Sequence, residues 1–88
     1  MKKVKQRKQA LGTKNIVGAR VEIARKNRGM KQRELLAQLQ TRGIDMNEST
    51  LSKLEGQVRC VMDFELPVLA DILAVSVDWL LGREIKKI

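Results

Sequence analysis

The sequence lacks the residues on which most catalytic and metal sites depend. It contains no histidine and a single cysteine, Cys60, among 88 residues. One thiol cannot form an internal disulfide, and without an imidazole or a second thiol it cannot complete a zinc site. A glycine-rich loop that could cradle a phosphate is also missing. We therefore expect no enzyme activity, no metal and no cofactor, and the cysteine usage favours a reducing cytoplasm.

Aromatic residues and long apolar runs are equally scarce. Phe64 and Trp79 are the only aromatic residues, so the core must be aliphatic, and such a composition favours an all-α domain. The stacking platforms of common RNA-binding modules are therefore absent. No run approaches the roughly 18 apolar residues of a membrane span, and the N-terminus lacks the apolar stretch of a signal peptide. We expect no membrane partner and a cytoplasmic location.

Positive charge is present in excess but unevenly distributed. The formal net charge is +8. Residues 1–14 hold six Lys or Arg and no acid, residues 15–42 carry a net +5, and residues 43–88 a net −3. We expect 1–14 to be a flexible basic arm that reaches along a nucleic acid or anchors to it without specificity. A compact domain over 15–82 and a short charged tail over 83–88 complete the organisation.

Apolar spacing and capping residues predict five helices in the domain. A first helix begins near Ile16, with Val17, Val21 and Ala24 facing inward, and stops at Gly29. A second runs from Gln32 to about Arg42 and ends at Gly43.

Three further helices follow a short connection over residues 43–46. The third spans about 48–55 after an N-cap at Asn47, with Met46 and Leu51 spaced as a hydrophobic staple. The fourth follows a cap at Asp63 with Pro67 in its first turn, and the fifth lies between Ser76 and Gly82.

The order of these motifs resembles a known family. GARVEIARKNRGMKQRELLAQL, NESTLSKLEG and FELPVLADILAVSVDWLLG are similar to the Xre-type, lambda repressor and Cro-like helix-turn-helix family, over about residues 15–82. The resemblance implies a compact five-helix, lambda repressor-like fold and a sequence-specific regulator of transcription that binds double-stranded DNA as a homodimer, most often as a repressor. Two departures mark a longer-turn variant: Lys31 stands where members carry a capping Thr or Ser, and the segment from Leu39 to Ser49 is about five residues longer, which leaves the tilt of the third helix open.

The resemblance also implies roles for the third helix, which would lie in the major groove. The base-reading positions are Glu48, Ser49, Thr50, Ser52 and Lys53. Lys53 can donate to guanine and Glu48 can accept from cytosine. Glu48 could instead balance the positive end of its helix, and Thr50 could serve packing.

Other positions are expected to hold the domain on the phosphate backbone or to hold it together. The phosphate candidates are Lys26, Arg28, Lys31, Gln32 and Arg59, each of which could instead belong to a solvated face. The resemblance implies an intramolecular ion pair between Arg25 and Glu55. Trp79 is expected either at an exposed dimer interface or as a cap on the core, and Cys60 and Met62 are expected to pack.

One alternative belongs to a different functional class. The same fold could serve as an antitoxin-like or other protein-interaction module, in which DNA binding is secondary. A stoichiometric protein partner that copurifies with the chain would distinguish the two hypotheses.

Overall fold

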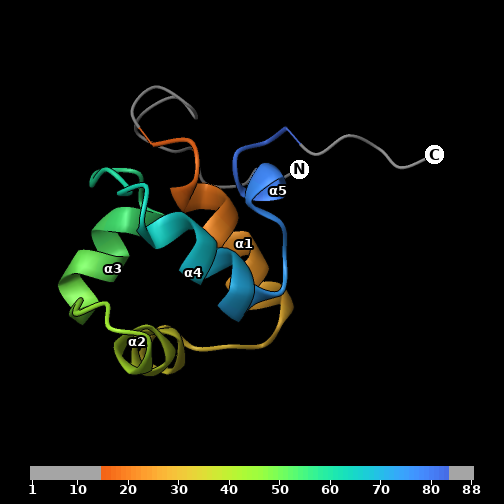
Figure 1. Cartoon of the computed structure of the whole chain (residues 1–88). Coiled ribbons are helices and arrows are strands. Elements are labelled where there is room, and N and C mark those ends of the chain that lie inside the picture. The colour runs from red at the N-terminus through yellow and green to blue at the C-terminus, as the bar shows by residue number, and fades with distance from the viewer. Residues whose placement is uncertain (1–14, 84–88) are drawn as a thin grey trace, which may run out of the picture.

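The computed structural model describes residues 15–83, which form five helices and no strand (Figure 1). They are α1 (Gly18–Asn27), α2 (Gln32–Thr41), α3 (Glu48–Glu55), α4 (Glu65–Leu73) and α5 (Val77–Leu80). The all-α fold class is confirmed. The predicted arm over 1–14 and residues 84–88 of the predicted tail lie outside the described residues.

The helices enclose an aliphatic core. α3 packs against α1 and α2, and α4 packs against α1, α2 and α5. The predicted inward positions of the first helix are confirmed: Val21 and Ala24 of α1 are buried, and so is Val17, which immediately precedes it. The other buried members of the core cluster are Leu35, Leu39, Ile44, Leu51, Leu54, Leu69, Ala70, Ile72, Leu73 and Leu80. None of the helices between residues 15 and 83 is long and apolar enough to cross a membrane.

Local capping rules place the starts of α3 and α5 correctly. The Asn47 side-chain oxygen accepts a hydrogen bond of 2.8 Å from the Thr50 N–H, and the Ser76 hydroxyl accepts one of 2.9 Å from the Trp79 N–H. Both bonds satisfy an amide of the first turn that no preceding carbonyl can reach. The predicted bounds of the third helix, 48–55, are confirmed.

The starts of α1 and α4 differ from prediction. α1 begins at Gly18 because the Asn15 side-chain oxygen accepts from the N–H groups of Val17, at 3.0 Å, and Gly18, at 2.6 Å. The predicted cap at Asp63 is wrong: α4 begins at Glu65 without a side-chain cap. A hydrogen bond of 2.9 Å from the Met62 N–H to the Glu65 carboxylate ties down the preceding turn instead.

The start of α2 lacks a capping side chain at Lys31. Glu34, one turn later, supplies a hydrogen bond there instead. The Lys31 side chain makes no capping bond, because an ammonium group has nothing to accept with. The Glu34 carboxylate instead accepts a hydrogen bond of 2.7 Å from the Lys31 N–H. This is the second half of a capping box, and it also places a negative charge at the positive end of the helix.

Gly18 lies at a close approach between α1 and α3. A Cβ atom at this position would lie 1.9 Å from the Leu54 carbonyl oxygen, in the last turn of α3. No side chain can be accommodated at that distance unless the two helices move apart. The start of α1 and the end of α3 are therefore in direct backbone contact.

Gly18→Ala should destabilise the protein by about 1–3 kcal/mol, because α1 and α3 must separate to admit the methyl group. The matched control is Gly56→Ala, where φ is −81° and the nearest backbone oxygen would lie 3.1 Å from the new Cβ. Urea unfolding followed by circular dichroism measures both. Equal stability of Gly18→Ala and the wild type would contradict the close approach.

Candidate nucleic-acid interface

One face of α3 is exposed and polar. Glu48, Ser49, Ser52 and Lys53 are all exposed on it, whereas Thr50 is half-buried. The opposite face, formed by Leu51, Leu54 and Glu55, is buried. Four of the five predicted base-reading residues thus share a solvent-facing surface, and Thr50 is partly withdrawn from it.

Glu55, at the last turn of α3, is held by α1. Its Oε2 lies 2.7 Å from Arg25 Nε and its Oε1 lies 3.0 Å from Arg25 Nη2, so the pair is bidentate. Both side chains are buried. The hydrogen bond to Glu55 raises the pKa of Arg25 above its ordinary value, against the opposing effect of burial. Arg25 Nη1 also donates to the Met30 carbonyl at 2.8 Å, which fixes the turn into α2.

Gln32 extends this network to the exposed face of α3. Its Nε2 donates to Glu55 Oε1 at 3.0 Å, and its Oε1 accepts from the Ser52 hydroxyl at 3.3 Å. A chain of polar contacts thus runs from the buried ion pair through the start of α2 to a predicted base-reading residue. It fixes the first turn of α2 relative to the exposed face of α3.

Asn15 and Gln57 fasten the start of α1 to the end of α3, and both were missed by sequence reasoning. Asn15 Nδ2 donates to the carbonyls of Leu54, at 3.0 Å, and Arg59, at 2.6 Å. Gln57 Nε2 donates 2.8 Å to the Asn15 carbonyl. Gln57 also has a positive φ of 68°, which a residue with a side chain rarely adopts. Asn15, as a residue type that caps helices, carried a usable signal, whereas nothing in the sequence marks Gln57.

Three of the five predicted phosphate-binding residues are exposed near the start of α2. Lys26 and Arg28 lie at the end of α1 and beyond, and Lys31 immediately precedes α2. The Lys26 ammonium lies 3.0 Å from the Glu22 carboxylate one turn earlier. Such an exposed pair is weak and can exchange for a phosphate.

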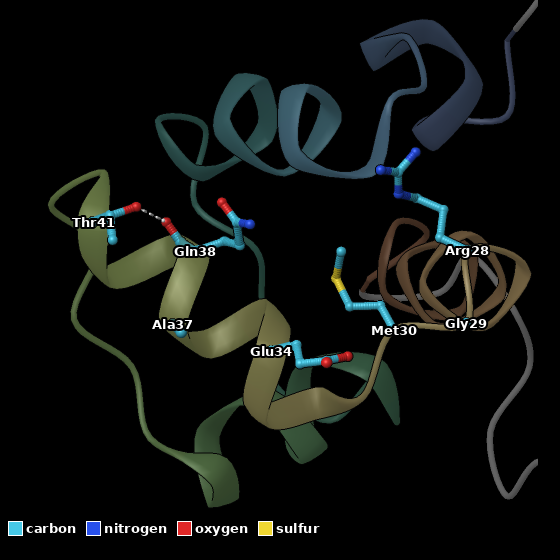
Figure 2. Close-up of a pocket in the computed structure, with 7 residues that line it drawn as sticks. All are labelled: Arg28, Gly29, Met30, Glu34, Ala37, Gln38 and Thr41. Carbon is cyan, nitrogen blue, oxygen red and sulfur yellow. Dashed lines mark hydrogen bonds between the residues drawn. The ribbon is translucent and has the colours of Figure 1, made fainter.

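Arg28 borders an open groove of about 590 Å³ between the turn after α1 and the outer face of α2 (Figure 2). Figure 2 shows Arg28, Met30 and Gln38 directed to the same side of this groove. The other lining residues are Gly29, Glu34, Ala37 and Thr41. Every lining residue except the half-buried Met30 is exposed. The groove is therefore an open feature of the surface. The Arg28 side chain that borders it is exposed to solvent.

Arg59, which was predicted to bind a phosphate or to belong to a solvated face, is paired with a carboxylate of its own chain. Its two terminal nitrogens lie 3.0 and 2.9 Å from the carboxylate oxygens of Glu65, which is buried. Burial alone would raise the pKa of Glu65, but the hydrogen bonds from Arg59 and from the Met62 N–H, with the guanidinium charge, outweigh it and lower that pKa. The pair ties the loop after α3 to the start of α4.

Trp79 is half-buried, not fully exposed as one expectation had it. The Arg20 guanidinium carbon lies 4.2 Å from the centroid of the indole ring, a cation–π contact between α1 and α5. Arg20 Nε also donates to the Trp79 carbonyl. Cys60 and Met62, which were expected to pack, are exposed.

Arg25→Ala should destabilise the protein by about 3–5 kcal/mol, because the Glu55 carboxylate would remain buried without its counter-charge. Lys26→Ala is the matched control one residue away, where loss of the exposed pair with Glu22 should cost less than about 1 kcal/mol. Thermal and urea unfolding measure both changes. An unchanged thermal midpoint for Arg25→Ala would show that the pair does not hold α3.

The lowered pKa of Glu65 predicts a stability change in acid. The stabilisation should be complete above the ordinary glutamate pKa of 4.5 and should be lost as the pH falls through the lowered value. Glu65→Gln should therefore be clearly less stable than the wild type at neutral pH, and the gap should narrow in acid. Urea midpoints at pH 7 and in strong acid test this, with the exposed Asp45→Asn as control. A gap independent of pH would contradict the assignment.

Comparison with known proteins identifies no family for this chain. A search of protein-family models, curated proteins and solved structures found no match to this chain. The resemblance to helix-turn-helix regulators therefore depends on the motifs in the sequence, and any function must be argued from the surface around α2 and α3.

Proposed function

We propose that the chain binds double-stranded DNA sequence-specifically and regulates transcription, acting as a repressor by occupying a promoter. The observation that carries the proposal is the exposed polar face of α3, supported from behind by the buried Arg25 to Glu55 pair. A helix that reads bases must be both open to solvent and rigidly oriented. α3 meets both conditions.

The side chains on that face suit the edges of base pairs. Ser49 and Ser52 are short, so the helix can approach the floor of the major groove, and a hydroxyl can donate or accept there. Lys53 can donate to guanine O6 and N7. Glu48 can accept from cytosine N4, and its place in the first turn also favours a negative charge.

The start of α2 is the proposed phosphate contact. The backbone N–H groups of Gln32 and Arg33 lie in the first turn, where no helical carbonyl can accept from them. Lys31 and Arg28 add positive charge on either side of Met30. Because Gln32 touches Ser52, a phosphate bound here would fix how α3 enters the groove.

In-vitro selection of duplexes tests the function directly. The full chain should enrich a defined sequence from random duplexes at moderate salt, and a palindromic site would indicate a twofold dimer whose half-sites lie about one helical turn apart. Failure to enrich any sequence over random DNA would end the proposal.

Two substitutions should then separate base reading from phosphate binding. Lys53→Ala should weaken target binding by about 1–3 kcal/mol and relax the preference at one base pair. Lys31→Ala should weaken binding to target and random DNA alike and reduce the salt slope by about one.

Arg42→Ala is the control for general loss of positive charge, since this guanidinium lies 3.8 Å from Asp71 of α4. Titrations at several salt concentrations measure all three variants. Loss of base preference in Lys31→Ala, or none in Lys53→Ala, would contradict the assigned roles.

A further inference from the structure

The exposed apolar side chains of the domain gather near the point where residues 1–14 join it. Of the five large hydrophobic residues exposed among the described residues, three lie in the loop between α3 and α4: Val58, Met62 and Phe64. A fourth, Ile16, lies two positions after residue 14. Val58 is 69% exposed and Phe64 63%. Apolar groups gathered in this way mark an interaction surface more often than single exposed residues do. We refer to the three loop residues as the loop patch.

The way α3 ends leaves the Val58 side chain uncovered. The Val58 N–H donates to the Lys53 carbonyl at 2.8 Å, so the chain turns back over the last turn of the helix. At such a helix end, the residue in the position of Val58 commonly packs on an apolar side chain three or four places from the end of the helix. Here those places hold Lys53 and Ser52, both exposed and polar. Val58 therefore lacks the apolar contact that usually covers this position.

Hydrogen bonds hold this loop against the first residue that the structure describes. Asn15 Nδ2 donates to the Arg59 carbonyl at 2.6 Å, and Gln57 Nε2 donates to the Asn15 carbonyl at 2.8 Å. The Met62 N–H donates to the Glu65 carboxylate at 2.9 Å, which fixes the far side of the loop. A surface ordered in advance loses less entropy when it binds. Residues 1–14 therefore leave the domain directly beside an ordered apolar surface.

We infer that the loop patch is the docking site of residues 10–14 of the same chain, with the Leu11 side chain packed on Val58 and Phe64. Residues 10–14 themselves lie outside the described residues. Leu11 stands four positions before Asn15 and is the large apolar residue of 1–14 nearest to it. Four residues span at most about 14 Å, so Leu11 has to lie near the loop in any conformation. The docking goes beyond the proposed function and does not require it.

The size of the patch favours a segment that is already attached. A stable interface between separate molecules buries about 800 Å² on each partner, which three side chains cannot provide. A tethered segment needs less area, because a short tether gives it an effective concentration on the order of millimolar at the site. The attachment at Asn15 provides such a tether within a few residues of the patch.

The charges around the patch also favour residues 1–14. The loop and the start of α4, residues 57–65, hold one base and two acids. Arg59 is paired with Glu65 at 2.9 Å, so the exposed Asp63 carboxylate leaves this surface with a net charge of −1. Residues 1–14 hold six Lys or Arg and no acid, and Lys14 directly precedes Asn15. A second copy would instead bring its whole net charge of +8 against a chain of the same charge.

A nitroxide label on Cys60 tests the docking directly. Cys60 is the only cysteine of the chain, is exposed, and lies between Val58 and Met62. In the labelled full chain, the amide NMR signals of residues 9–11 should be broadened by the nearby nitroxide. Leu11→Ser should remove this broadening, and Val4→Ser, the matched change seven positions earlier, should leave it as in the wild type. Equal broadening in the wild type and Leu11→Ser would overturn the inference.

A double-mutant cycle measures the contact between Leu11 and the patch without a label. Leu11→Ser should lower the folding equilibrium constant about fivefold, the effect expected when one aliphatic side chain loses part of its apolar contact. In a background of Val58→Ser with Phe64→Ser, the same change should have no effect, because the surface on which Leu11 packs is gone. The control background is Ile23→Ser, which changes a 48% exposed residue of α1, and there the two losses should add. Losses that add in both backgrounds would overturn the inference.

Mixing experiments distinguish the arm from other occupants of the patch. Nitroxide-labelled chains mixed with isotope-labelled chains that carry no nitroxide should give no broadening of residues 9–11. Broadening in this mixture would give the patch to a second copy and would overturn the inference. A protein that copurifies with the chain and is lost in the Val58→Ser with Phe64→Ser variant would also overturn it. None of these measurements uses DNA, so the docking stands if they succeed while no duplex sequence is selected.

Discussion

The buried carboxylate of Glu55 is the group on which the arrangement of the first three helices depends. It lies in the last turn of α3, where the helix dipole disfavours a negative charge, and it is buried. A carboxylate in such a place must be matched by donors. Arg25 of α1 and Gln32 of α2 supply them at 2.7 to 3.0 Å. One acidic side chain therefore joins three helices, and α3 cannot tilt without breaking the charged contact.

A second set of contacts fixes the same end of α3 through the backbone. Asn15 bonds the carbonyls of Leu54 and Arg59, and Gly18 allows α1 to reach the Leu54 carbonyl without a side chain between them. These contacts and the ion pair all lie on the side of α3 that faces the core. The outward face is left with exposed polar residues whose hydrogen bonds are not needed for folding, apart from the contact between Ser52 and Gln32. The core-facing side of α3 thus holds the helix in place, while its outward side stays open to solvent. Both are required of a helix that contacts bases, as proposed for α3.

Rules that depend on neighbouring residues predicted the helices well. They predicted the partners of individual side chains less well. The caps Asn47 and Ser76, and the bounds of α3, follow from residues within one turn, so the sequence alone suffices. Arg59 was predicted to bind a phosphate or to belong to a solvated face, because its pairing with Glu65 depends on how the loop between them folds. Trp79 likewise meets Arg20, 59 positions away along the chain. In both of these cases the side chain is occupied by a partner beyond its own helical turn.

The excess positive charge of the chain lies mostly outside the described domain. Residues 15–83 contain ten Lys or Arg and nine Asp or Glu, so the described domain is nearly neutral. Within it, Arg25 and Arg59 are bound to buried glutamates and contribute little field at the surface. Most of the excess charge belongs to residues 1–14. In the proposed function, long-range attraction to DNA and recognition of a sequence would therefore be carried by different parts of the chain, since counterion release depends on charge, and base reading on the geometry of α3.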